Sequence, residues 1–117
     1  MGLFSNSKQL NWNSVSTPEE IDQLIQSNEP VLLFKHSNRC GVSRMALSAF
    51  EKDFVENDAT NIYLIDVVSK RQVSNHIENI SGIRHESPQV LLLSKKEVIY
   101  HASHSNIDAN EINKLMS

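Results

Sequence analysis

Apolar and polar positions along the chain form blocks that predict helices and strands in succession. Apolar residues first recur at helical spacing at Ile21, Leu24 and Ile25, and a continuous apolar run follows at residues 31–34. The helix is expected to begin at Pro18, within Thr17-Pro18-Glu19-Glu20. A hydroxyl residue before a proline in the first turn, with acidic residues after it, favours the amino end of a helix. Short continuous apolar runs are typical of strands buried on both faces. The pattern therefore begins with a helix that leads into a buried strand.

The alternation continues to the end of the chain. Apolar residues repeat at helical intervals after Cys40, and the later blocks predict a strand at 61–68, a helix at 69–80, strands at 89–93 and 98–101, and a closing helix around 107–116. The polar turn 94–97 is short enough to pair the last two strands antiparallel. The order α-β-α-β-α-β-β-α is that of the thioredoxin fold. We therefore expect an α/β protein with a thioredoxin-like fold, a central mixed sheet flanked by helices.

Length and charge narrow the classes of function. A chain of 117 residues without an internal repeat or linker fits a single thioredoxin-like domain over residues 1–117. The 11 Lys and Arg residues are scattered among 14 Asp and Glu, so the formal charge of -3 argues against nucleic acid or an anionic membrane as partner. No segment has the length and apolarity of a membrane span or the core of a signal peptide. A cytoplasmic protein is expected.

The only cysteine, Cys40, is the strongest candidate for chemistry. It cannot form an intramolecular disulfide, which fits a reducing compartment. Cys40 lies where a buried strand gives way, through a polar approach, to a helix, and the free N–H groups of a helix start together with Arg39 favour the reactive thiolate. The alternative is that Cys40 is a small buried hydrophobe, as free cysteines often are. The polar residues before it argue against burial.

The residues that follow Cys40 belong to the same helix start. Gly41 lets a substrate backbone or sulfur approach closely, and Val42 lies in the same first turn. Ser43 stands where dithiol enzymes of Cys-x-x-Cys type carry their second cysteine. Its hydroxyl can stabilise a thiolate or be an ordinary residue of a first turn, but it cannot resolve a mixed disulfide. The second thiol must therefore come from another molecule.

Ser87-Pro88 precedes the third predicted strand. A cis bond at this position would direct backbone groups toward the thiol and offer hydrogen bonds to an extended partner, although most X-Pro bonds are trans.

The histidines are less informative about function than Ser87-Pro88. His101 and His104 lack recognisable metal-ligand spacing, so no metal site is expected. His36 is a structural histidine or an assisting acid or base, and strand alternation, which can turn its ring away from the thiol, favours the structural role.

The segment Phe34-Lys35-His36-Ser37-Asn38-Arg39-Cys40-Gly41-Val42-Ser43 resembles the active-site segment of the monothiol bacilliredoxins, the YtxJ-like family. The resemblance extends through Trp12, Thr17-Pro18-Glu19-Glu20, Tyr63-Leu64-Ile65-Asp66-Val67 and Gly82-Ile83-Arg84-His85-Glu86-Ser87-Pro88-Gln89. It implies a thioredoxin-like fold, a cis Ser87-Pro88 bond and an oxidoreductase of redox homeostasis that acts through Cys40.

The resemblance also implies the partners. Cys40 would remove bacillithiol from bacillithiolated client proteins, with Arg39, Gly41, Val42, Ser43, Ser87 and Pro88 stabilising the thiolate or binding substrate. A second bacillithiol would free Cys40 and give bacillithiol disulfide, which a separate flavin-dependent reductase recycles. Bacillithiol is thus a co-substrate, and neither a metal nor a bound cofactor is expected.

One departure from the family pattern concerns the residue after the cysteine, which is commonly proline and here is Gly41. The segment Cys40-Gly41-Val42-Ser43 also resembles the Cys-Gly-Phe-Ser motif of monothiol glutaredoxins, which can bridge an iron-sulfur cluster between two subunits. The Gly-Gly pair that those proteins use for glutathione is missing from residues 91–101. A third hypothesis is a non-enzymatic binding or sensor domain that is regulated by modification of Cys40.

Overall fold

The computed structural model describes residues 10–116. The amino-terminal residues 1–9, to which part of the signal-peptide argument refers, and Ser117 lie outside the described residues. The elements are α1 (Pro18–Gln26), β1 (Val31–His36), α2 (Gly41–Asp53), β2 (Asn61–Asp66), α3 (Arg71–Ser81), β3 (Gln89–Ser94), β4 (Glu97–Ser103), the 3-10 turn η2 (His104–Asn106) and α4 (Ala109–Met116). Their succession confirms the order predicted from the apolar pattern.

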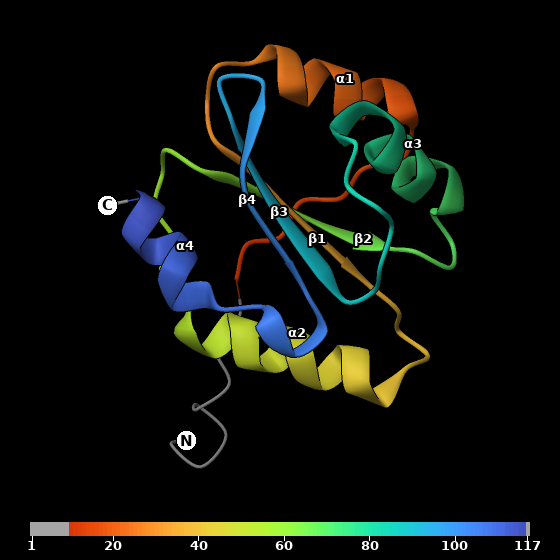
Figure 1. The fold of residues 1–117 in the computed structure, drawn as a ribbon, viewed down its shortest axis with the longest axis vertical. Helices are drawn as coiled ribbons and strands as arrows, with labels where there is room; N and C mark the ends of the chain where they lie inside the picture. Colours follow the sequence, from red (N-terminus) through yellow and green to blue (C-terminus); the bar gives the residue numbers. More distant parts are fainter. Residues whose placement is uncertain (1–9, 117) are drawn as a thin grey trace.

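The four strands form one mixed sheet in the order β2-β1-β3-β4 (Figure 1). β1 is parallel to β2, with Val31 opposite Asn61, and antiparallel to β3, with Lys35 opposite Gln89. β3 and β4 form an antiparallel hairpin, as the short turn predicts. The carboxyl end of β1, which leads to Cys40, therefore lies beside the start of β3.

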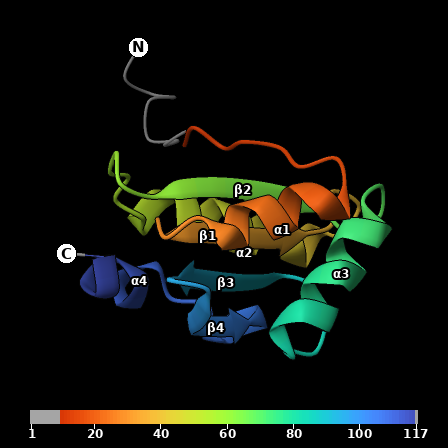
Figure 2. The same ribbon diagram turned by 90° about the horizontal axis from the view of Figure 1, so that it is seen from above.

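Helices cover both faces of the sheet (Figures 1 and 2). On one face Leu32 and Phe34 of β1 pack in a cluster with Phe50 of α2 and Ile112 of α4. On the other face, Val31 and Leu33 pack with residues of α1 and α3. All six residues of β1 are buried, which explains its nearly continuous apolar run. The alternation of β1 thus assigns even-numbered residues to the α2 face and odd-numbered residues to the α3 face.

Several element boundaries differ from the predicted ones, and two of them have a clear local cause. α2 ends at Asp53, because Phe54 adopts an extended backbone conformation, although apolar spacing continues to Val55. β2 ends at Asp66, whose carboxylate accepts a hydrogen bond from the Val68 N–H at 3.1 Å and thereby starts a turn. Apolarity alone does not reveal such local side-chain contacts with the backbone. The predicted start of α1 at Pro18 is confirmed, and Thr17 and Glu20 form a capping box there.

The described segment before α1 contributes a single β-bridge to the sheet, between Asn13 and Tyr63. The Asn13 N–H donates to the Ile62 carbonyl at 2.9 Å and the Asn13 carbonyl accepts from the Leu64 N–H at 3.0 Å. Trp12 packs against Phe34 and its Nε1 donates to Glu51 of α2 at 2.7 Å. The segment thus attaches to the outer edge of the sheet. Across residues 10–116 no helix combines the length and apolarity that crossing a membrane requires.

Candidate active site

Cys40 lies at the amino end of α2, after the turn that follows β1. Its backbone is extended, and its carbonyl accepts the first helical hydrogen bond, from the Arg44 N–H at 3.0 Å. No side chain caps this end of α2, so the first N–H groups of the helix remain available beside the sulfur. Cys40 is free and exposed. The expectation of an accessible thiol at a helix amino end is confirmed, and the alternative of a buried cysteine is wrong.

The turn before Cys40 is held by hydrogen bonds of Ser37. Its carbonyl accepts from the Cys40 N–H at 3.2 Å, and its hydroxyl accepts from the Arg39 N–H at 3.3 Å. The Ser37 N–H in turn donates to the Ser43 hydroxyl at 2.9 Å. These contacts fix the angle at which the chain enters α2. The Arg39 side chain is exposed and directly precedes Cys40 in the chain.

Ser43 is buried, and the contact with Ser37 assigns it to the support of this turn. Within residues 10–116 its hydroxyl makes no hydrogen bond to the sulfur of Cys40. Gly41 is exposed and has no positive φ, and a Cβ built there would meet nothing within 4 Å. The position therefore has room for a side chain. The role of Gly41 in admitting a partner stays a prediction.

The Ser87–Pro88 bond is cis, which confirms the prediction. Because Gln89 lies opposite Lys35, the bond lies beside the end of β1 that leads to Cys40. The Pro88 carbonyl accepts a hydrogen bond from the His104 N–H at 2.9 Å, which attaches the end of β4 to the same place. The Ser87 hydroxyl is buried and has no hydrogen-bond partner among the described residues.

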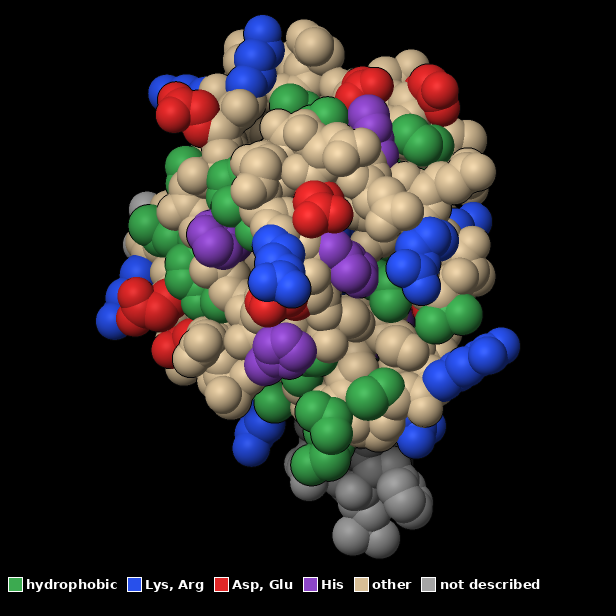
Figure 3. Space-filling view, turned by 45° about the vertical axis from the view of Figure 1, so that its right-hand side comes forward, with side chains coloured by type: hydrophobic (Ala, Val, Ile, Leu, Met, Phe, Trp, Pro, Cys, Tyr) green, Lys and Arg blue, Asp and Glu red, His purple; other side chains and the backbone are tan. Residues whose placement is uncertain are grey.

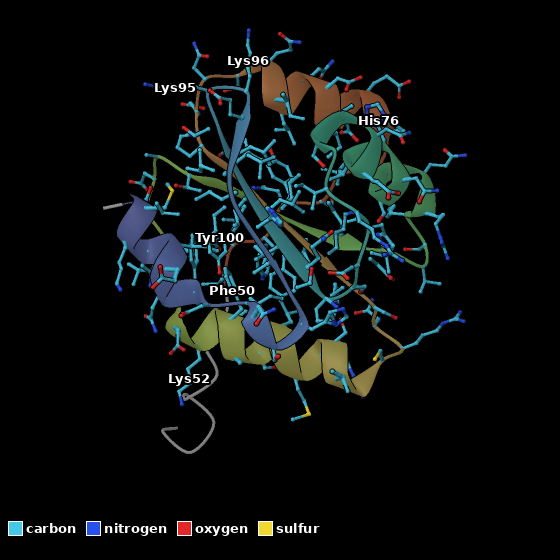
Figure 4. The ribbon with its side chains drawn as sticks, in the orientation of Figure 1. Phe50, Lys52, His76, Lys95, Lys96 and Tyr100 are labelled. Atoms are coloured by element: carbon cyan, nitrogen blue, oxygen red, sulfur yellow. The ribbon has the colours of Figure 1, made fainter. Side chains whose placement is uncertain are left out.

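A groove of about 430 Å³ joins the helix start to the cis bond. Its walls are mostly apolar and come from α2, Pro88 and the segment between β4 and α4; they are formed by Val42, Ala46, Ala49, Phe50, Asp53, Pro88, His104, Ser105, Ile107, Asp108 and Ala109. Val42 at its mouth and the neighbouring Met45 are exposed, and apolar side chains gather at the lower edge of Figure 3, where α2 lies. Figure 4 shows Phe50 directed from α2 toward the sheet and Lys52 directed away.

The groove brings together two of the residues named from the sequence, Val42 and Pro88, whereas Cys40 is not part of its walls and lies two residues before Val42. The part of it that comes from His104 to Ala109 was not predicted. No local signal identifies that segment, because it reaches the groove only through the pairing of β4 with β3 and the His104–Pro88 hydrogen bond. The predicted absence of a metal site at His101 and His104 stays a prediction, although no group of three possible metal ligands occurs within residues 10–116.

His36 lies on the α2 face of the sheet and not on the opposite face, as the register of β1 shows. Its side chain is buried, and its Nδ1 has no hydrogen-bond partner among the described residues. Burial lowers the pKa of His36, and the nearby carboxylates of Asp66 and Glu51 oppose this effect. The ring is therefore neutral near pH 7. The structural role favoured for His36 from the sequence stays a prediction.

A second buried polar group, which the sequence analysis did not single out, lies on the α3 face. The Lys35 side chain is fully buried, and its Nζ contacts the Ser74 carbonyl at 3.1 Å and His85 Nδ1 at 3.3 Å. Burial lowers the pKa of Lys35 to about 8, with Glu78 acting in the opposite direction. A lysine within an otherwise apolar strand is the signal that could have identified it.

Known structures show the same fold. A protein described as a putative oxidoreductase with a thioredoxin fold is 26% identical over 89% of this chain and 92% of its own, with a TM-score of 0.76. The thioredoxin of Malassezia sympodialis is 18% identical over 93% and 90%, with a TM-score of 0.68. A mutant thioredoxin of Halobacterium salinarum is 20% identical over 87% and 84%, with a TM-score of 0.63. The thioredoxin-like fold predicted from the element order is thus confirmed.

The sequence was also compared with models of protein families. The model described as monothiol bacilliredoxin BrxC matches residues 13–112, a span that includes the exposed Cys40 at the start of α2, the cis Ser87–Pro88 bond and the strands between them. The match agrees with the resemblance carried by the segment around Cys40, and with an oxidoreductase as a structural neighbour. We conclude that this chain is a redox protein and belongs to the monothiol bacilliredoxin family.

Proposed function

We propose that the protein removes bacillithiol from mixed disulfides of client proteins through Cys40. The observation that carries the proposal is one exposed thiol at an uncapped helix start, two residues from Val42, where an apolar groove begins that extends to Pro88 of the cis-proline loop. The helix start supplies N–H groups that stabilise a thiolate. The groove offers a surface for the client chain near its modified cysteine, and the backbone at Ser87 offers hydrogen bonds to an extended segment.

The exchange takes two steps. The Cys40 thiolate attacks the bacillithiol sulfur of the client disulfide; a bond forms between Cys40 and bacillithiol, and the client leaves as a thiolate that takes a proton from water. The thiolate of a second bacillithiol then attacks the bacillithiol sulfur on Cys40, which releases Cys40 and forms bacillithiol disulfide. In the net exchange the client sulfur is reduced to a thiol and one free bacillithiol is oxidised, so the disulfide bond passes from the client to bacillithiol disulfide. A separate flavin-dependent reductase closes the cycle.

The chain has no other cysteine, so the second step requires the external thiol. Ser43 cannot replace it, and its hydroxyl is engaged with the Ser37 N–H. The exposed Arg39, next to Cys40 in the chain, would favour the approach of a negatively charged thiolate in each step. Val42 and Pro88 contribute to the surface on which the partner rests.

Intact mass spectrometry tests the proposal directly. Reduced protein is mixed with a synthetic peptide whose single cysteine carries bacillithiol, first without and then with free bacillithiol. We expect one bacillithiol per Cys40 in the first case and repeated turnover in the second. The Cys40→Ser variant should transfer nothing. Transfer by that variant, or purification of the wild type with the visible absorbance of an iron-sulfur cluster shared by two subunits, would contradict the proposal.

A sensor domain that is regulated by modification of Cys40 would differ from an enzyme in the second step of the exchange, the release of bacillithiol from Cys40. A sensor would accept bacillithiol on Cys40 and keep it when free bacillithiol is added at millimolar concentration. Release at a rate well above that of the bacillithiol adduct of an unstructured cysteine peptide supports the enzyme. The peptide adduct is therefore the reference in this measurement.

A further inference from the structure

The Lys35 amine is held in the interior without an acidic partner. Its Nζ contacts the Ser74 carbonyl and His85 Nδ1, and within residues 10–116 it forms no ion pair with a carboxylate. Burying an ammonium group is costly when no opposite charge compensates it. An apolar side chain of similar length would fill the same space at lower cost. A purely structural role therefore does not explain Lys35.

The contacts of Lys35 determine the state of His85. An ammonium group only donates, so His85 Nδ1 accepts and the ring proton lies on Nε2. The Ser74 hydroxyl is 2.8 Å from the same Nδ1. Burial lowers the pKa of His85, and the positive charges of Lys35 and Arg71 lower it further, while Glu78 and Glu86 act in the opposite direction. The ring is thus neutral and is oriented by contacts from β1 and α3.

His85 belongs to the loop 82–88, which ends in the cis Ser87–Pro88 bond. The loop is also held from β3: the Gln89 side chain donates to the Arg84 carbonyl at 2.9 Å and accepts from the Glu86 N–H at 3.4 Å. Gln89 lies directly opposite Lys35 in the sheet. Two facing buried side chains therefore hold three consecutive residues of the loop just before Ser87.

We propose that Lys35 and His85 are positioning residues, which hold the Ser87–Pro88 backbone beside the groove so that a client disulfide meets Cys40. This inference rests on the proposed function, because it concerns docking of the client in that exchange. Neither side chain acts on the sulfur itself. Loss of either should weaken reactions that require a docked peptide and leave the intrinsic reactivity of Cys40 unchanged.

Two reactions separate docking from thiol reactivity. The first is transfer from a bacillithiolated synthetic peptide to Cys40, measured over a range of peptide concentrations. The second is alkylation of Cys40 by iodoacetamide, which is small and needs no docking. We expect Lys35→Met and His85→Leu to slow transfer about tenfold at low peptide concentration, mainly through a higher half-saturating concentration, and to change alkylation by less than about twofold.

Two further variants distinguish positioning from general destabilisation. His85→Asn places an acceptor near the position of Nδ1 and should recover most of the transfer rate. His76→Leu is the matched control: His76 belongs to α3 (Figure 4) and its Nε2 contacts Asp22 of α1 at 2.7 Å, away from the loop. It should transfer at the wild-type rate.

Three results would overturn the inference: wild-type transfer rates in Lys35→Met and His85→Leu, an equal loss in alkylation, or an equal loss in His76→Leu. The same peptide carrying thionitrobenzoate separates this inference from the proposed function. If the wild type reacts with that peptide and not with the bacillithiolated one, the proposed function fails. The transfer rates of the wild type and the variants on the thionitrobenzoate peptide then decide whether Lys35 and His85 position the loop.

Discussion

Lys35 of β1 and Gln89 of β3 face each other in the sheet, and both bury polar side chains against the same loop. The other residues of this sheet face are mostly apolar and pack against α1 and α3. The polar pair lies at the end of the sheet where β1 leads to Cys40. This face of the sheet is thus least hydrophobic next to the site where exchange is proposed. Lys35 and Gln89 would then lower folding stability there in favour of function.

Replacing Lys35 by Met should raise the free energy of unfolding. The pKa of Lys35 is about 8 in the folded protein and 10.5 in the reference state. Below pH 8 the amine is protonated in both states and the full cost of burial applies. Between pH 8 and 10.5 the unfolded chain binds more protons, so the wild type gains stability as pH rises, by about 3 kcal/mol in total.

Urea unfolding of the wild type and Lys35→Met at several pH values checks this prediction. The advantage of the variant should be largest below pH 8 and should decrease toward pH 10.5. Other groups titrate in this range, so only the difference between the two proteins is interpreted. A difference that does not depend on pH would show that burial does not lower the pKa of Lys35 in the folded protein.

The pKa of His85 should rise in Lys35→Met. Burial is the main cause of its lowered pKa, and the positive charge of Lys35 is the next cause. Removal of that charge leaves burial and Arg71 to lower the pKa, so the shift should be reduced and not abolished. NMR titration of the imidazole protons measures it.

Cys40 should react with iodoacetamide at pH 7 faster than a cysteine in an unstructured peptide. The thiolate is the attacking form, and the uncapped start of α2 together with Arg39 stabilises it. Arg39→Gln should slow the reaction by about twofold, because an exposed charge contributes little in water. A wild-type rate equal to that of the peptide would remove the chemical basis of the proposed function.

Ser43→Ala should lower the free energy of unfolding by about 1 kcal/mol, because the Ser37 N–H loses its acceptor. Transfer of bacillithiol should persist, at the same rate or more slowly, since no step uses the hydroxyl as a nucleophile. Ser48→Ala, an exposed position on the same helix, is the control and should change stability by less than about 0.5 kcal/mol. Complete loss of transfer in Ser43→Ala would show that the hydroxyl takes part in the exchange.

Gly41→Pro should raise the free energy of unfolding by about 0.4–1 kcal/mol, because Gly41 occupies the first helical position and has open space around it. The proline also removes one N–H group near the sulfur. We therefore expect slower alkylation of Cys40 alongside the gain in stability. Thermal unfolding and the iodoacetamide rate measure the two effects separately.

Much of the fold was predictable because its signals are local. A continuous apolar run marks β1, and the change to a polar turn before Cys40 marks the start of a helix. The turn between β3 and β4 is short, so their pairing follows from chain connectivity. The accessibility of Cys40 follows from the same local change in polarity. The cis bond was expected only through resemblance to a family, since most X-Pro bonds are trans.

The sequence by itself determined the succession of elements and the place of the reactive cysteine, whereas only the tertiary structure decided what surrounds it. His36 faces α2 because of the register of β1, and a shift by one residue would have reversed it. Lys35 meets His85, fifty residues later, and His104 meets Pro88 only once the strands are paired. Local propensity depends on neighbours within a few residues, but such contacts depend on strand order and register. These arise when the whole chain buries its apolar faces together.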